Sequence, residues 1–124
     1  MNIKDAVHKA IYLNANLRED ILCFSNDHTR KCFIKSVMDN DREGKYRAEL
    51  YQYLSGVAQF YIYQVSIKAI EILGNQIDDN EFLVAIDSMV AKPILKDVAD
   101  ESNKAVEEIM REYDEDRKRR GAEA

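Results

Sequence analysis

The 124-residue sequence predicts an all-α fold, a compact bundle of about five helices with a long central helix and a charged C-terminal helix. Three observations lead to this prediction. The chain contains only one proline and four glycines, and so few helix breakers favour long helices. Its composition, 46% hydrophobic and 33% charged, supports a folded core. Apolar residues also recur three or four positions apart in successive segments, as they do on the buried face of a helix.

The length of the chain fits one domain. We expect a single helical domain over residues 1–113. Residues 114–124 are expected to form a charged tail, a solvated helix end that frays into disorder, because no large apolar residue follows Tyr113. No apolar run approaches the length of about 20 residues that crosses a bilayer, and the amino terminus is charged. These features predict a cytoplasmic protein without a membrane partner.

The first helix is expected to begin after Asn2, whose side chain can cap it, and to end near Leu13. Asn16 is predicted to cap a second helical piece, and the sequence leaves open whether the two pieces are continuous. The buried side of the second piece is predicted to consist of Ile21, Leu22 and Phe24. A third helix is expected to turn Phe33, Ile34, Val37 and Met38 inward and to stop before Asp39.

The loop from Asp39 to Gly44 resembles the first half of an EF-hand calcium loop, with oxygen donors at alternate positions and glycine at the turn. The second half departs from that pattern because Leu50 occupies the place of the bidentate glutamate and Glu49 comes one residue early. The alternatives are a calcium loop and a polar turn between two helices, and the polar turn is favoured.

The segment from Lys45 to Leu73 is ambiguous, since β-branched residues after Tyr61 also suit a strand. Its polar residues recur at helical spacing, which favours one long central helix. The predicted buried stripe consists of Tyr51, Leu54, Ala58, Ile62, Val65, Ala69 and Ile72.

Gly74 is expected to end the central helix in a left-handed turn, and a residue from Asp78 to Asn80 to cap the next helix. Pro93 predicts a break or kink, after which it suits the start of the last helix. The inward seam of this helix is predicted to contain Leu95, Val98, Ser102, Ala105, Ile109 and Tyr113.

Cys23 and Cys32 are too few for a disulfide framework and are interpreted as small apolar core residues. Together with His8 and His28 they offer zinc-binding atoms, but at a spacing unlike that of structural zinc sites. No metal and no cofactor are therefore expected. The sequence also contains no glycine-rich phosphate loop, no nucleophile elbow and no paired histidines, so it does not predict an enzyme.

Aromatic residues concentrate in the central segment, where they cannot all point inward from one helix. Exposed aromatic side chains are enriched at protein interfaces, which predicts a protein-interaction module such as an inhibitor, immunity protein, adaptor or small subunit. The chain's net charge of -5 suits a protein partner with a basic surface, and the alternative partner is a second copy in a homo-oligomer. The candidate partner-binding residues are Tyr46, Tyr51, Tyr53, Phe60, Tyr61 and Tyr63.

The alternative hypothesis is a nucleic-acid-binding subunit that uses local basic clusters. The cluster at the carboxyl end also has a purely structural interpretation, since acidic residues four positions earlier can form ion pairs along the helix. The candidate nucleic-acid-binding residues are Arg30, Lys31, Lys35, Arg117, Lys118, Arg119 and Arg120.

One scattered set of residues spans large gaps of the sequence and consists of Glu49, Leu50, Tyr53, Leu54, Phe60, Tyr61, Phe82, Leu83, Pro93, Ile94, Glu101 and Ser102. This set resembles the small helical subunit of type III CRISPR effector complexes, without that family's aromatic carboxyl-terminal ending. The resemblance falls short of a family assignment. It implies a subunit lining an RNA-guided filament, with Arg30, Lys31 and Lys35 near the RNA backbone.

Overall fold

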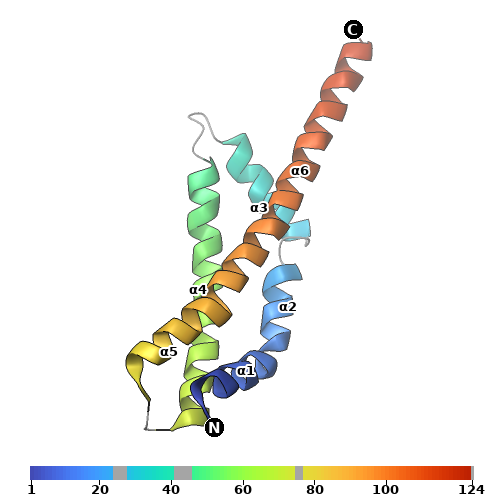
Figure 1. Cartoon of the computed structure of the whole chain (residues 1–124). Helices are drawn as coiled ribbons and strands as arrows, with labels where there is room; N and C mark the ends of the chain where they lie inside the picture. Colours follow the sequence, from blue (N-terminus) through green and yellow to red (C-terminus); the bar gives the residue numbers. More distant parts are fainter. Residues whose placement is uncertain (24–27, 41–45, 75–76, 124) are drawn as a thin grey trace.

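The computed structural model describes residues 1–23, 28–40, 46–74 and 77–123, and this part of the chain is an all-α bundle, as predicted. Figure 1 shows two long helices, α4 and α6, crossing along the molecule, with the shorter helices packed against them. The elements in chain order are α1 (Ile3–Leu13), α2 (Ala15–Cys23), α3 (His28–Asp39), α4 (Tyr46–Leu73), α5 (Asp79–Ile86), the π-helical turn η1 (Asp87–Ala91) and α6 (Lys92–Glu123).

Helices α1 and α2 form one hydrogen-bonded path with a bend at Asn14. The Asn2 side chain accepts a bond from the Asp5 N–H at 2.8 Å, which confirms the predicted cap. At the bend the Asn14 N–H donates to the Ala10 carbonyl at 3.1 Å, and the Asn14 carbonyl accepts from the Arg18 N–H at 3.0 Å. The prediction that Asn16 caps α2 is wrong, because α2 begins at Ala15 and the bend lies at Asn14.

Helix α4 is a single helix from Tyr46 to Leu73, so the helical prediction for this segment is confirmed over the strand alternative. Gly74 ends it with a φ of 76°, a left-handed conformation that glycine adopts without a steric penalty. The Asp78 carboxylate accepts a bond from the Glu81 N–H at 3.0 Å and so caps α5.

The distortion predicted at Pro93 takes the form of a π turn and not of a break. The Lys92 N–H donates to the Asp87 carbonyl, five residues earlier, and helical dihedral angles persist on both sides of η1. Proline has no N–H to offer, and its ring clashes with the carbonyl four residues before it. An extra residue in the turn shifts these carbonyls, so α5, η1 and α6 continue as one distorted helix.

The core divides into two clusters of buried side chains. The larger cluster joins α4 to α1, α5 and the first turns of α6. The smaller one lies between α3, α4 and α6 and contains Ile34, Leu50, Ala105 and Ile109. The predicted seam of the last helix is confirmed at Val98, Ser102, Ala105 and Ile109, which are buried. Its other two members, Leu95 and Tyr113, are half-buried, and Ile94 is buried in place of Leu95.

Polar contacts link α6 to the helices beside it, among them an Arg18–Asp97 ion pair to α2, a Lys31–Glu108 ion pair to α3, and a hydrogen bond donated by the Tyr113 hydroxyl to Asp39 of α3. The hydrogen bond from Lys31, together with its charge, lowers the pKa of Glu108. Burial, and then the Asp39 carboxylate, raise the pKa of Tyr113 to about 12.

The carboxyl-terminal turns of α6 extend beyond the other helices (Figure 1). Helix α6 runs to Glu123, and the side chains from Asp114 to Gly121 are all exposed. In the described part of the chain, no helix combines the length and the apolar character needed to cross a lipid bilayer.

The prediction that the cysteines are core residues is wrong, because Cys23 and Cys32 are both exposed. Helix α2, which ends at Cys23, contains no buried residue. Cys32 lies two positions before Ile34 of α3, which is buried. Two residues correspond to about 200° around a helix, so Cys32 lies on the side of α3 opposite Ile34.

Candidate functional site

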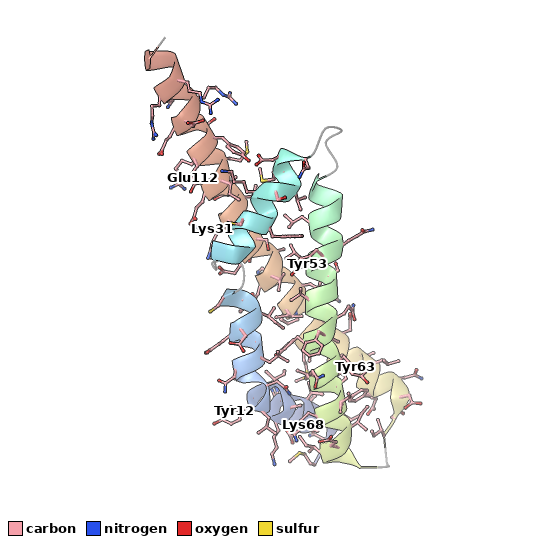
Figure 2. The ribbon with its side chains drawn as sticks, turned by 180° about the vertical axis from the view of Figure 1, so that it is seen from behind. Tyr12, Lys31, Tyr53, Tyr63, Lys68 and Glu112 are labelled. Atoms are coloured by element: carbon pink, nitrogen blue, oxygen red, sulfur yellow. The ribbon has the colours of Figure 1, made fainter. Side chains whose placement is uncertain are left out.

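Helix α4 has two opposite apolar faces, of which the bundle covers only one. The covered face contains Ala58, Val65 and Ala69, all completely buried. These side chains are small, so neighbouring helices can approach α4 closely there. The other face carries larger side chains, among them Tyr63, which projects from α4 in Figure 2, and Tyr53, whose ring packs beside Phe33 of α3.

The side chains on this second face follow a regular spacing along α4. Their positions alternate between three and four residues apart, the repeat by which one helix packs along another. Phe60 is 54% exposed, Tyr63 62% and Ile70 44%, whereas Ile67 is half-buried. We call this set the outer stripe; it consists of Tyr53, Gly56, Phe60, Tyr63, Ile67 and Ile70.

The outer stripe from Tyr53 to Ile67 lies in an uncharged stretch of helix, and its last member, Ile70, lies between Lys68 and Glu71. No Asp, Glu, Lys or Arg occurs from Gln52 to Ile67, although a third of the whole chain is charged. Near its carboxyl end the stripe borders a shallow hollow of 320 Å³, which Ile67 and the half-exposed Leu13 of α1 line together with Gln64, Lys68 and Glu71. Near its amino end the Tyr53 ring lies 4.7 Å from the Phe33 ring of α3. Apolar surface therefore extends from α4 onto α3, whereas the hollow beside α1 is lined mainly by polar residues.

Gly56 lies in the middle of this stripe, where the fold of the single chain does not require it. Its φ is not positive, and a Cβ atom at this position would meet nothing within 4 Å. Glycine inside a helix costs about 0.5–1 kcal/mol relative to alanine. The chain therefore carries a destabilising residue in the middle of the outer stripe without an internal steric reason.

The predicted partner-binding residues fall into three groups. Tyr53, Phe60 and Tyr63 are exposed on the outer stripe. Tyr61 is only 2% exposed and belongs to the core, where burial raises the pKa of its hydroxyl. The side chains of Tyr46 and Tyr51 lie outside the described part of the structure.

The predicted nucleic-acid-binding residues divide between α3 and the end of α6. Lys31 pairs with Glu108, and the Lys35 ammonium lies 5.7 Å from the centre of the Tyr113 ring. The side chain of Arg30 is not among the described ones. The four basic residues from 117 to 120 are exposed at the projecting end of α6, where Arg120 pairs with Asp116 at 3.2 Å, one of the predicted ion pairs along the helix.

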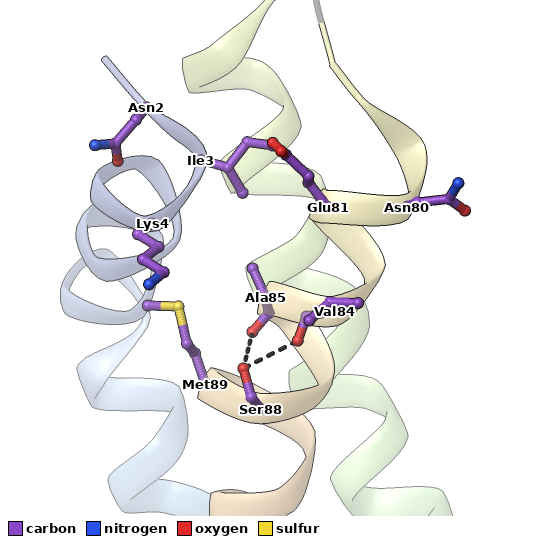
Figure 3. A pocket seen from close by; sticks show the side chains of 9 residues that line it. All are labelled: Asn2, Ile3, Lys4, Asn80, Glu81, Val84, Ala85, Ser88 and Met89. Atoms are coloured by element: carbon purple, nitrogen blue, oxygen red, sulfur yellow. Dashed lines mark hydrogen bonds between the residues drawn. The ribbon is translucent and has the colours of Figure 1, made fainter.

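A separate groove of 680 Å³ lies between the start of α1 and α5–η1 (Figure 3). Its lining is mainly apolar, with Ile3, Val84 and Met89 among the residues. The Ser88 hydroxyl donates to the Val84 carbonyl at 2.9 Å and is also 3.4 Å from the Ala85 carbonyl. The Ser88 hydroxyl is thus bonded to backbone carbonyls of its own helix and not to a basic side chain, so this groove does not activate Ser88 as a nucleophile.

The EF-hand-like loop is described only at its start. Asp39 accepts the hydrogen bond from Tyr113, and residues 41–45 lie outside the described part of the chain. Among the described side chains, no three His, Cys, Asp or Glu residues gather as a metal site would require.

The prediction from sequence missed Gly56, Ile67, Ile70 and Leu13. The alternating spacing of three and four residues from Tyr53 to Ile70 was a readable signal for most of them. The buried face of the same helix, which contains Ala58, Val65 and Ala69, has an equally regular spacing, so the spacing alone did not single out the exposed face. Comparison of the chain with protein-family models, curated proteins and solved structures gave no match.

Proposed function

We propose that this protein is a non-enzymatic interaction module that binds a protein partner stoichiometrically through the outer stripe of α4. The observation that carries this proposal is an exposed row of aromatic side chains in an uncharged stretch of a highly charged protein. Protein interfaces are enriched in tyrosine and phenylalanine and depleted of charge at their centres.

The size of the stripe supports the proposal. Aromatic side chains cover about 200 Å² each, so the exposed fractions of Tyr53, Phe60 and Tyr63 leave about 300 Å² of aromatic surface in contact with water. The largest apolar patch of a typical monomer is of this size and is often functional. The acidic surface outside the stripe favours encounter with a partner that has a basic face, an effect that weakens as salt rises.

The test is affinity capture of protein partners with the tagged chain, compared with its Tyr63→Glu variant. Met110→Glu is the matched control, because it places the same charge on an exposed apolar position of α6. A partner retained after nuclease treatment by the parent chain and by Met110→Glu, but lost with Tyr63→Glu, is the expected result. Equal retention of the partner by all three chains would show that the partner does not bind through the outer stripe.

A second candidate function is nucleic-acid binding by the end of α6. The observation in its favour is the position of Arg117, Lys118 and Arg119, exposed on turns that extend beyond the bundle. Binding through phosphate contacts would weaken steeply with salt. Deletion of the residues after Asp116 should then abolish binding of RNA or DNA, and unchanged binding would reject this candidate.

A further inference from the structure

We infer that the outer stripe of α4 binds the same stripe of a second copy of this chain, with the two α4 helices antiparallel. The inference rests on the proposed function and takes a second copy, which has the same acidic surface, as the occupant of the stripe in place of a partner with a basic face. The occupant must present an uncharged helical face, because a charged group buried against this stripe would find no opposite charge from Gln52 to Ile67. The chain itself carries such a face.

Side-chain volumes along the stripe select the antiparallel direction. Suppose that the two-fold axis passes between Phe60 and Tyr63. Phe60 of each copy then lies opposite Tyr63 of the other, and Tyr53 lies opposite Ile70. Gly56 falls opposite Ile67, so the position without a side chain faces a bulky one. In a parallel pair Gly56 would face itself and leave a gap, which would cost packing contacts.

This arrangement gives Gly56 a role. The absence of a Cβ lets the partner's Ile67 approach the helix backbone. The residues flanking the stripe are also compatible with self-pairing, since no like charges meet. The flanking residues are Gln52, Val57, Gln59, Gln64, Ser66 and the exposed Glu71, which in this register lies opposite Gln52 of the other copy.

The area predicts a weak dimer. Two copies would cover about 600 Å² of aromatic surface, twice the exposed aromatic area of one copy. Ile67, Ile70, Leu13 and the flanking glutamines bring the total towards the lower limit of about 1,000 Å² for specific interfaces. We therefore expect the dimer to form at micromolar concentrations and not at nanomolar ones.

The first experiment is sedimentation velocity of the purified chain over a range of concentrations. A reversible monomer–dimer equilibrium is expected, and Tyr63→Glu should weaken it at least tenfold whereas Met110→Glu should not. A parent chain that stays monomeric up to millimolar concentration would overturn the inference. A dimer that Tyr63→Glu does not weaken would overturn it as well.

The second experiment tests the register by disulfide cross-linking. Cys23 and Cys32 are exposed, so both are first replaced by serine. A mixture of the Gly56→Cys and Ile67→Cys chains should then cross-link between copies. Gly56→Cys alone should not, because the two copies of this position lie eleven residues, or about 16 Å, apart along the antiparallel pair. Efficient cross-linking of Gly56→Cys to itself would refute the antiparallel register.

A charge pair provides a register test that does not depend on packing at Gly56. Phe60→Lys and Tyr63→Glu chains should each be monomeric alone and should associate when mixed, because the two charges meet across the antiparallel pair.

If all the self-association tests fail but Tyr63→Glu still abolishes capture of another protein, this inference falls and the proposed function stands. If capture is also unaffected, both fall.

Discussion

Replacing Gly56 by alanine should stabilise the monomer, although glycine lies at the centre of the candidate surface. The added Cβ meets nothing within 4 Å, so the change carries no steric cost. Alanine gains about 0.5–1 kcal/mol over glycine inside a helix, because glycine loses more backbone entropy on folding. In a chain of this length that gain corresponds to a rise in melting temperature of about 2–4 °C.

The assay for Gly56→Ala is urea unfolding followed by circular dichroism, at a concentration where the chain is monomeric. The midpoint should rise with an unchanged slope, which identifies a change in stability without a change in the compactness of the unfolded chain. Gly121→Ala is the matched control, since its Cβ also meets nothing within 4 Å. It should gain less, because Gly121 lies near the end of α6, where helices fray. A destabilised Gly56→Ala chain would refute the reasoning and show that the fold itself requires this glycine.

The remaining predictions concern side chains of α6, one of which is compared with Ile70 of α4. Ser102→Ala should stabilise the chain by about 1 kcal/mol, measured by denaturant unfolding, since the buried Ser102 hydroxyl has no hydrogen-bond partner among the described residues; a loss of stability would contradict this. The raised pKa of Tyr113 stabilises the fold fully below pH 10, and this contribution should decline as pH rises from 10 to about 12. Tyr113→Phe should remove that part of the alkaline decline in melting temperature, and an unchanged pH profile would show that Tyr113 is not its source. Ile94→Val should cost about 1 kcal/mol at a buried position, whereas Ile70→Val on the outer stripe should cost little in the monomer; equal costs would contradict the burial pattern.

Most helices could be predicted because their signals are local. The Asn2 cap, the turn at Gly74 and the Asp78 cap each depend on a few neighbouring residues, and all three are confirmed. The cap of α2 was predicted at Asn16, whereas α2 begins at Ala15, directly after the bend at Asn14. Asn14 and Asn16 have the same side chain, so sequence alone does not show which of them lies at the bend.

Burial of single residues was less predictable. The cysteines were placed in the core and are exposed, whereas Tyr61, proposed for a binding surface, is buried. Both side chains are compatible with core and surface, so their residue type does not settle the question. Phe33 was expected to face inward and instead lies 39% exposed beside Tyr53, at the edge of the contact between α3 and α4.

The sequence by itself determined that α4 is a long helix with apolar residues around most of its circumference. Only the tertiary structure decided which face is buried. The stripe through Ala58, Val65 and Ala69 and the stripe through Phe60, Tyr63 and Ile70 are both regular and both apolar, so periodicity does not distinguish them. The other helices pack on the stripe of small residues because close packing of helix backbones maximises contact there. The large aromatic side chains are left on the outside, and they form the candidate binding surface.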